Sequence, residues 1–381
     1  MNLKKYGMKI LVVSNNYPSL ENPTRGVFVY NLIQHFCRLG HEVSVICPKN
    51  ILSEGSKKVE SYGIESCKVY RPFIFSASNK QIGSFNTYQV TELVQIKGVQ
   101  RTVRKHNLKF DFVYAHFMMN GIIAVNALQK YNKPIFVAIG ESDLIGLTKM
   151  YPEDYFKENI KKIKGFIAVS NKLKDQLIGF GISRNKIFMK PNAVDLTKFY
   201  QRDKAEMRKK YRLPTELKLV AFVGRFLPHK GPLRVLKAVE NLDNVGVLFM
   251  GTGPQEPIGS SVVFNESVPS YQIPELLSAA DIFVLPTERE GSCNAIAEAI
   301  ACGLPVVSSK IPEVMDQCHS SFSILVNPLD VKAIEMAIDS ILSDEEKREE
   351  MSKNALEYSK NFEIGERAAS ILNFIKETIE A

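Results

Sequence analysis

The sequence predicts an α/β protein made of two doubly wound, Rossmann-like parallel-sheet domains that face each other across a cleft. Its 381 residues are too many for one ordinary hydrophobic core. Short apolar runs of strand length alternate with helical stretches, and this alternation occurs once before and once after a charged stretch at residues 200–218. Strands that alternate with helices favour a parallel sheet covered on both faces.

We expect an N-terminal domain over residues 1–194, a linker over 195–217 and a C-terminal domain over 218–362. Residues 363–381 are expected to form a C-terminal helix that packs back towards the N-terminal domain. In open α/β sheets, ligands bind beyond the carboxyl ends of the strands. The predicted site is therefore the cleft between the two domains.

In the first half, the apolar run KILVVSN (9–15) predicts a buried strand. The stretch GVFVYNLIQHFCRLG (26–40) has the apolar spacing of a helix and ends in glycine, and HEVSVICP (41–48) predicts a second strand. Further buried strands are predicted at 110–117, 134–140, 165–170 and 186–194.

The second half begins with the strand LVAFVGRF (219–226) and a helix over 230–241. Its last strand, FSILVNP (322–328), precedes two helical stretches that run to the end of the chain. Between them we predict strands at 245–251, 262–264, 281–287 and 305–309, and helices at 272–280 and 292–302.

The composition is that of an ordinary soluble globular protein, with 45% hydrophobic and 24% charged residues. The apolar run near the start is too short for a signal peptide, and no stretch approaches the ~18 apolar residues of a spanning helix. The six cysteines include no C-x-x-C pair and no histidine at ligand spacing, so we expect neither a metal site nor a disulfide framework. A cytoplasmic location fits this pattern.

Charge is divided unevenly along the chain. Residues 1–190 contain 28 Lys and Arg against 13 Asp and Glu, a net charge of +15, and the remainder has a net charge of −7. A basic first half suits a phosphate-bearing substrate or a peripheral contact with an anionic membrane, for which Lys161, Lys162 and Lys164 are candidates. Solubilising lysines on helix faces are an equally plausible explanation. No nucleic-acid motif is present, so we expect no nucleic-acid partner.

Two common nucleotide-binding fingerprints are missing. Neither the segment after the first strand nor GTGPQEP (251–257) fits G-x-G-x-x-G, and no P-loop occurs. The sequence therefore disfavours hydride transfer and ATP hydrolysis.

A basic pair follows the first strand of the second half. VGRFLPHKG (223–231) places Arg225 and Lys230 at the carboxyl end of that strand. Arg as a planar fork and Lys as a point charge suit a pyrophosphate, although a solvated turn with two basic residues would look the same.

A pair of carboxylates brackets the start of a predicted helix in EREGSCNAIAEAIACGLPVV (288–307). Glu290 precedes the helix and Glu298 lies within it, eight residues later, which turns it by about 80° on helical geometry. The first backbone N–H groups of the helix, around 292–294, form a potential anion site. The two carboxylates could then accept hydrogen bonds from hydroxyls on either side of a phosphate, or each could simply be solvated.

The stretch PTEREGSCNAIAEAIACGLPVVSS resembles the E-x7-E region of retaining GT-B glycosyltransferases of family 4. The opening NNYPSLENPTRGVFVYNLIQHFCRLGHEVSVICP, the segments YAHFMMNGIIA, FIAVSNKLKDQL and PNAVDLTKF, and GRFLPHKG are also similar to this family, so the resemblance covers nearly the whole chain. The YPSLENPTRGVFV opening is similar to enzymes of capsular, teichuronic-type or other cell-envelope polysaccharide biosynthesis.

The resemblance implies a role for each matching residue. Arg225 and Lys230 would bind the donor diphosphate, Glu290 would hold the transferred sugar, Glu298 would hold the ribose and His116 would lie beside the reacting sugar. The implied catalytic residues are His116, Arg225, Lys230 and Glu290. The implied donor-binding residues are Gly26, Arg225, Lys230, Glu290, Gly291, Ser292, Cys293, Asn294 and Glu298. On the residues alone, a single histidine at a strand end is more often structural.

Two segments depart from the family pattern. Where the family has His-Gly-x-Asp, this chain has GESD (140–143), which leaves Glu141 and Asp143 as candidate acceptor-side contacts. The helix that usually follows GTGP is reduced to QEPIGSS, which places recognition of the base in doubt.

The expected activity is metal-independent, retaining transfer of a hexose-type sugar from a UDP- or GDP-linked donor to a saccharide or lipid-linked saccharide. The nucleotide-sugar is a substrate and no cofactor is expected. The alternatives are a non-catalytic GT-B subunit that binds nucleotide or polymer, and a GT-B enzyme with epimerase or phosphorylase chemistry. The expected location is the cytoplasm, at the inner face of the plasma membrane.

Overall fold

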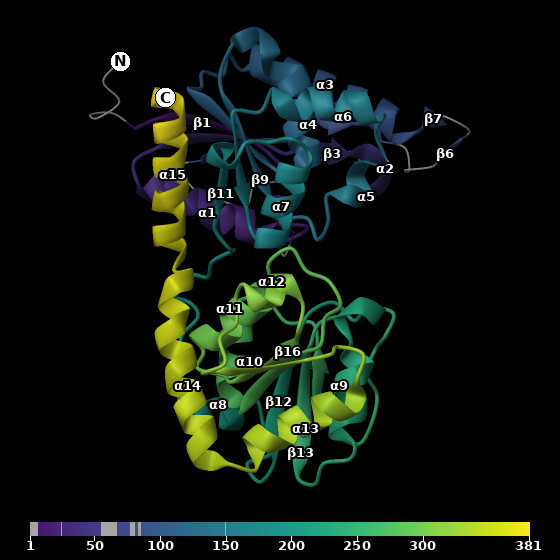
Figure 1. Ribbon diagram of the computed structural model, residues 1–381, viewed down its shortest axis with the longest axis vertical. Helices are drawn as coiled ribbons and strands as arrows, with labels where there is room; N and C mark the ends of the chain where they lie inside the picture. The colour runs from purple at the N-terminus through teal and green to yellow at the C-terminus, as the bar shows by residue number, and fades with distance from the viewer. Residues whose placement is uncertain (1–6, 24, 55–66, 77–80, 83–84, 149) are drawn as a thin grey trace. The chain divides into compact units, whose positions relative to one another are not determined.

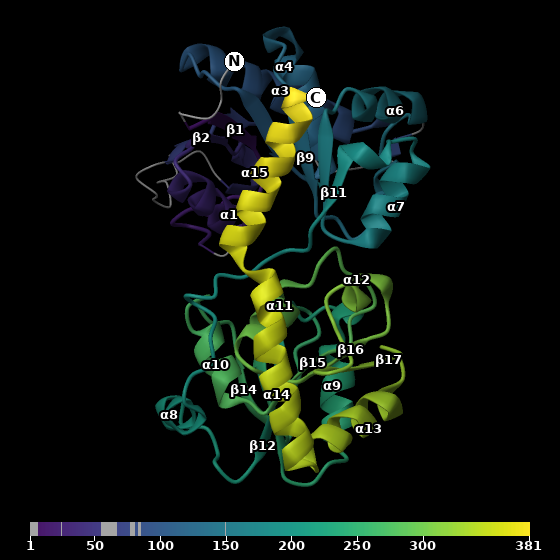
Figure 2. The same cartoon turned by 60° about the vertical axis from the view of Figure 1, so that its left-hand side comes forward.

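The structure is a computed structural model that describes residues 7–23, 25–54, 67–76, 81–82, 85–148 and 150–381. The chain divides into two compact units. Unit 1 consists of Met1–Lys190 with Gly365–Ala381, and unit 2 consists of Pro191–Ile364. Each unit contains a parallel sheet with helices on both faces (Figure 1 and Figure 2).

The sheet of unit 1 has seven parallel strands among the described residues, in the order β11-β10-β9-β8-β1-β2-β4. The strand order reverses between β1 and β8, and this reversal is the switch point at which ligands bind in doubly wound folds. The strands are β1 (Lys9–Val13), β2 (Glu42–Ile46), β4 (Cys67–Tyr70), β8 (Phe112–His116), β9 (Ile135–Ile139), β10 (Gly165–Ala168) and β11 (Ile187–Met189); β3 (Lys49–Asn50) pairs with β5 (Phe73–Ile74), and β6 (Gln81–Ile82) with β7 (Phe85–Asn86).

Two hydrophobic cores cover the faces of this sheet, because successive side chains of a strand point to opposite faces. Leu11 and Val13 of β1 belong to the core under α3, α4, α6 and α7, whereas Ile10 and Val12 belong to the core under α1 and α15. Figure 2 shows α15, from the far end of the chain, lying across the strands of unit 1. The helices are α1 (Val27–Arg38), α2 (Ile51–Glu54), α3 (Tyr88–Lys105), α4 (Met118–Leu128), α5 (Ile145–Thr148), α6 (Glu153–Lys161), α7 (Asn171–Gly179) and α15 (Ile364–Glu380).

The sheet of unit 2 has six parallel strands in the order β14-β13-β12-β15-β16-β17, and its switch point lies between β12 and β15. The strands are β12 (Lys218–Val223), β13 (Val245–Met250), β14 (Val262–Glu266), β15 (Ile282–Leu285), β16 (Val306–Ser309) and β17 (Ser323–Val326).

In unit 2, α9 (Pro232–Val239) packs against α13 (Val331–Leu342), and the two helices lie side by side in Figure 1. On a different side, α11 (Asn294–Ala301) packs against α14 (Glu345–Ser359). The remaining α-helices are α8 (Lys204–Lys210), α10 (Ile273–Ala279) and α12 (Pro312–Met315), and a short 3₁₀ helix, η3 (Pro228–Lys230), precedes α9.

The prediction of two doubly wound parallel sheets is confirmed. The segment 195–217, which we expected to be a linker, instead lies within unit 2. Its helix α8 contributes the buried Arg208, which donates to the carbonyl of Ala279 (3.0 Å) and forms an ion pair with Asp281 (2.7 Å). None of the helices described is both long and apolar enough to span a bilayer.

The end of the chain contains three helices instead of the two that we predicted. Asp344 separates α13 from α14, because its side chain accepts the N–H of Lys347 and caps the second helix. The 3₁₀ helix η4 (Lys360–Phe362) and Glu363, which forms an isolated bridge with Val194, then separate α14 from α15.

Replacing Ile371 of α15 should destabilise unit 1, because this side chain is fully buried in the core shared with α1. Ile371→Ala is expected to lower the free energy of unfolding by about 2–4 kcal/mol. Urea denaturation followed by circular dichroism measures the change, with the exposed Glu377→Ala on the same helix as the matched control. Equal stability of the two variants would show that α15 is not part of this core.

Candidate active site

The switch point of unit 2 brings the predicted basic and acidic residues together. Arg225 and Lys230 follow β12, Glu290 follows β15, and these two strands are neighbours in the sheet. The carboxyl ends of neighbouring parallel strands meet at one edge of a sheet, and the reversal of strand order opens a crevice there. Lys230 and Glu290, which are 60 positions apart in the sequence, therefore lie next to each other.

Lys230 and Glu290 form an ion pair whose side chains are only 21% and 9% exposed. Burial acts to lower the pKa of Lys230, but the adjacent Glu290 carboxylate outweighs burial and holds that pKa above its ordinary value. The thiol of Cys293 lies close enough to act on the same pKa. The buried pair therefore supplies a lysine that stays charged.

Arg234 of α9 joins the two loops that contribute this pair. Its guanidinium donates to the carbonyls of Pro228 (2.9 Å) and Pro286 (2.8 Å) and forms an ion pair with Glu288 (3.0 Å). Gly231 has φ = 74°, and a Cβ atom there would lie 2.7 Å from the Arg234 guanidinium, so glycine is required at this position. Arg234 was not among the residues predicted from the sequence. Its position four residues after Lys230 could have indicated that it lies near the ion pair.

The backbone after Glu290 is already partly used by hydrogen bonds within unit 2. The N–H of Cys293 donates to Oε1 of Gln317 (2.6 Å), and Gln317 donates back to the carbonyl of Cys293 (3.3 Å). The Ser292 hydroxyl accepts the N–H of Asn192 (3.0 Å). The backbone N–H of Cys293 is therefore not available to an anion, and the predicted anion site at 292–294 has fewer free N–H groups than expected.

Asn294 and Gly291 complete this turn. Asn294 is the first residue of α11, and its Oδ1 atom is buried without a hydrogen-bond partner among the described residues. Gly291 is buried between Glu290 and the helix start. An unpartnered buried oxygen beside an N-terminal turn is a polar group that a bound ligand could satisfy.

The side chains of Arg225 and Glu298 have no hydrogen-bond or ion-pair partner among the described residues. Arg225 is exposed at the end of β12, where its guanidinium is available to a ligand. Glu298 lies in the second turn of α11, and burial raises the pKa of its carboxyl group to about 8. At neutral pH Glu298 is therefore mainly protonated and can donate a hydrogen bond as well as accept one.

At the switch point of unit 1, Gly26 precedes α1 with φ = 67°. A Cβ atom on Gly26 would lie 2.5 Å from the carbonyl carbon of Asn16 and 2.8 Å from the amide nitrogen of Tyr17. Glycine is thus required here by the close approach of the chain to itself, whatever ligand lies nearby.

His116 ends β8 and is only 5% exposed. The centroid of its ring lies 5.1 Å from that of Phe28 and 4.5 Å from that of Phe117. Its Nδ1 atom is buried without a partner among the described residues. Burial, helped by the positive charge of Arg367, lowers the pKa of His116 to about 3. The imidazole is therefore neutral at physiological pH and has one free buried nitrogen.

The two candidate acceptor-side carboxylates are engaged in local structure. Glu141 accepts the N–H groups of Met118 (2.6 Å) and Gly140 (3.0 Å), and burial raises its pKa to about 7. Asp143 accepts from the side chain of Gln176 (2.6 Å) and from the N–H groups of residues 145 and 146 (3.3 and 2.9 Å). Glu141 thus caps α4, and Asp143 fixes the turn at α5.

A double-mutant cycle measures the coupling between Lys230 and Glu290. Lys230→Ala leaves the Glu290 carboxylate buried without its partner, which should cost about 3–5 kcal/mol of folding free energy. Adding Glu290→Gln to this variant removes the buried charge and should restore much of the loss. Chemical denaturation of the four proteins measures the coupling, and additive effects of the two substitutions would contradict it.

Glu298 predicts a dependence of stability on pH. The carboxyl group of Glu298 has a pKa of about 8 in the folded protein, whereas its pKa in the unfolded chain is about 4.3. Between these pH values the unfolded chain loses the proton more readily than the folded protein does. The free energy of unfolding therefore falls as the pH rises from about 4.3 to about 8. Glu298→Gln should remove this loss, with a slope difference of at most about 1.4 kcal/mol per pH unit. Urea denaturation from pH 5 to 8 tests this, and parallel curves for the two proteins would contradict it.

Comparisons with known proteins agree with this architecture. Residues 26–198 match the family model Glycosyltransferase Family 4, and residues 203–358 match the model Glycosyl transferases group 1. The chain is 29% identical over 357 residues to the putative teichuronic acid biosynthesis glycosyltransferase TuaC of Bacillus subtilis, which covers 87% of this chain and 88% of that protein.

Two solved structures share the fold along nearly the whole chain. Sucrose-phosphate synthase from Thermosynechococcus elongatus superposes with a TM-score of 0.80 at 17% identity, over 98% of this chain and 99% of that one. HepE from Anabaena, solved in complex with UDP and glucose, superposes with a TM-score of 0.73 at 16% identity, over 97% of this chain and 100% of that one. The chain belongs to the GT-B glycosyltransferases that combine a family 4 N-terminal half with a group 1 C-terminal half.

Proposed function

We propose that this chain is a retaining glycosyltransferase that moves a hexose-type sugar from a UDP- or GDP-linked donor to a saccharide or lipid-linked saccharide. The observation that carries the proposal is the buried Lys230–Glu290 pair beside the exposed Arg225 at the switch point of unit 2. This arrangement offers two cations to a diphosphate and one carboxylate to sugar hydroxyls. HepE, which shares the fold, has been solved with UDP and glucose, and this supports a nucleotide-sugar donor.

In this proposal the diphosphate of the donor binds to Arg225 and Lys230. Arg225 offers a planar fork to two phosphate oxygens, and Lys230 offers a charged ammonium whose pKa is held high by Glu290. Glu290 accepts hydrogen bonds from the transferred sugar, and the protonated carboxyl of Glu298 suits the vicinal hydroxyls of a ribose. The amides that follow Gly291, with that of Cys293 excepted, complete the phosphate contacts.

Catalysis would consist mainly of electrostatic stabilisation. The bond from the anomeric carbon to the diphosphate oxygen breaks, the acceptor oxygen attacks from the same face, and the departing phosphate takes the acceptor's proton. Arg225 and Lys230 stabilise the charge that develops on the leaving diphosphate, so the proposal needs no metal. The neutral His116 would offer its free nitrogen to a hydroxyl of the reacting sugar.

The two glutamates do not suit the roles of a glycosidase pair. A retaining glycosidase needs one carboxylate as nucleophile and one carboxyl as acid, about 5–5.5 Å apart across the sugar. Here the carboxylate of Glu290 is already neutralised by Lys230, while Glu298 lies in the second turn of the following helix. Their environments favour binding of hydroxyl groups over attack on a sugar.

The similarity to TuaC supports a role in the assembly of cell-surface polysaccharide, such as a capsule or a teichuronic-type polymer. An acceptor of this kind would be met at the inner face of the plasma membrane. The basic character of residues 1–190 suits an acceptor that carries phosphate.

A donor panel tests the proposed activity. The protein is mixed with UDP-, GDP- and ADP-sugars and a saccharide acceptor, and released nucleoside diphosphate is measured. Lys230→Ala should lower kcat/KM by at least about 100-fold, because a cation that stabilises the leaving group is lost. The exposed Lys237→Ala on α9 is the matched control and should leave kcat/KM unchanged.

Near-normal turnover by Lys230→Ala would overturn the assignment of this residue. The absence of nucleoside diphosphate release from every donor would favour the non-catalytic subunit. The anomeric configuration of the product, determined by nuclear magnetic resonance, should match that of the donor. An inverted product would contradict the retaining mechanism, and an epimerised donor without a transfer product would indicate other chemistry.

A further inference from the structure

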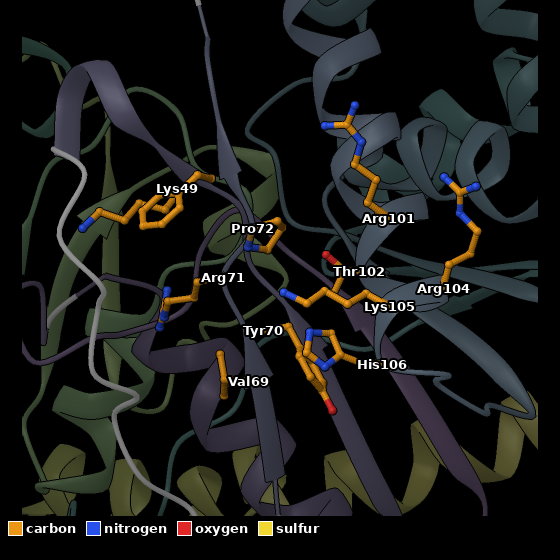
Figure 3. Close-up of a pocket in the computed structure, with 11 residues that line it drawn as sticks. Lys49, Val69, Tyr70, Arg71, Pro72, Arg101, Thr102, Arg104, Lys105 and His106 are labelled. Carbon is orange, nitrogen blue, oxygen red and sulfur yellow. The ribbon is translucent and has the colours of Figure 1, made fainter.

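Unit 1 contains a groove of about 910 Å³ along the edge strand of its sheet, between the end of β4 and the last turns of α3 (Figure 3). None of its lining residues belongs to the candidate active site. The groove lies wholly within unit 1, whereas Arg225, Lys230 and Glu290 belong to unit 2.

The lining of this groove is strongly cationic. It includes five lysine and arginine residues and one histidine, with no aspartate or glutamate among its described residues. The basic residues are Lys49, Arg71, Arg101, Arg104, Lys105 and His106. Cations at the end of a helix are favourable in themselves, which accounts for Arg104 and Lys105 on α3. Lys49 and Arg71 come from other segments, so the helix does not explain why they line the same groove.

Arg71 is held in place by its neighbours. Its guanidinium donates to the carbonyl of Pro18 (2.5 Å) and to the sulfur of Cys47 (3.4 Å), and it lies 6.0 Å from the centre of the Tyr17 ring. A further donor of this guanidinium, the Nε–H group, is buried without a partner in the part of the chain that the structure describes. A fixed arginine with one unsatisfied donor loses little entropy when it binds an anion.

The opposite wall adds further basic side chains and an aromatic surface. Figure 3 shows Lys105 reaching from α3 towards Pro72, with the guanidinium groups of Arg101 and Arg104 on the same side of the groove. The ring of His106 packs against that of Tyr70, with 4.6 Å between the ring centroids. The groove therefore combines basic side chains from separate segments with an aromatic surface formed by Tyr70 and His106, and its volume exceeds what one small anion needs.

We propose that this groove binds a phosphate ester or diphosphate group and the first part of its substituent. A multiply charged phosphate matches several Arg and Lys donors from separate segments better than a single carboxylate does. The group could be the diphosphate of a lipid-linked molecule or that of a soluble one. The inference depends only on unit 1 and does not require the transfer reaction proposed above.

Calorimetric titration with inorganic pyrophosphate tests the site. The titrated protein carries Arg225→Ala and Lys230→Ala, which remove both cations proposed to bind phosphate in unit 2. Adding Arg101→Glu with Lys105→Glu should weaken binding by at least about tenfold, because two charge-assisted contacts become repulsive. Lys133→Glu with Arg184→Glu is the matched control, since both residues belong to unit 1 outside the groove and the net charge changes equally. This control should change the affinity less than about twofold.

Three results would overturn the proposal. They are the absence of saturable pyrophosphate binding, an equal loss of affinity in both charge-reversed proteins, and displacement of pyrophosphate by glucuronate at similar concentration. Circular dichroism and Tm establish whether each variant is folded. If the charge reversal prevents folding, Arg101→Gln with Lys105→Gln replaces it and should still weaken binding.

Vesicle sedimentation distinguishes the two sources of the phosphate. The vesicles consist of phosphatidylcholine with or without a polyprenyl diphosphate. Retention that requires the diphosphate lipid and is lost in Arg101→Glu, Lys105→Glu assigns the groove to a lipid-linked ligand. Pyrophosphate binding without such retention assigns it to a soluble phosphate.

Discussion

The ion pair between Lys230 and Glu290 holds two distant loops together at the switch point of unit 2. One loop follows β12 and the other follows β15, and Arg234 joins the same loops through the carbonyls of Pro228 and Pro286. A buried charge pair costs desolvation and is retained only where its geometry is well satisfied. Within unit 2, the positions of Arg225 and of the start of α11 depend on these two loops.

This arrangement also sets the charge balance of the site. Because Glu290 neutralises Lys230, the exposed Arg225 and Arg289 are the arginines of these two loops whose side chains have no partner among the described residues. Glu298 adds no full charge at neutral pH, since burial raises the pKa of its carboxyl group to about 8. A diphosphate would therefore meet a site that is moderately positive and already ordered, which lowers the cost of reorganisation during the reaction.

Strand runs and motif spacing made much of the fold and part of the site predictable. The apolar runs at 9–15 and 219–226 correspond to β1 and β12. Arg225, Lys230 and Glu290 follow the predicted strands 219–226 and 281–287, which correspond to the neighbouring strands β12 and β15. Helix α3 was missed because its mean hydropathy is low and its buried face includes polar residues such as Thr91 and Gln95. The occupation of the Cys293 amide by Gln317 could not be foreseen, since it depends on a contact across 24 positions.

The central claim is that a nucleoside diphosphate binds at the switch point of unit 2. Hydrogen–deuterium exchange with and without UDP and GDP locates such binding most directly. We expect slower exchange of backbone amides at residues 224–231 and 288–296 when the nucleotide is bound, because these segments contain the proposed phosphate contacts. Protection confined to other segments, with unchanged exchange in these two, would contradict the account.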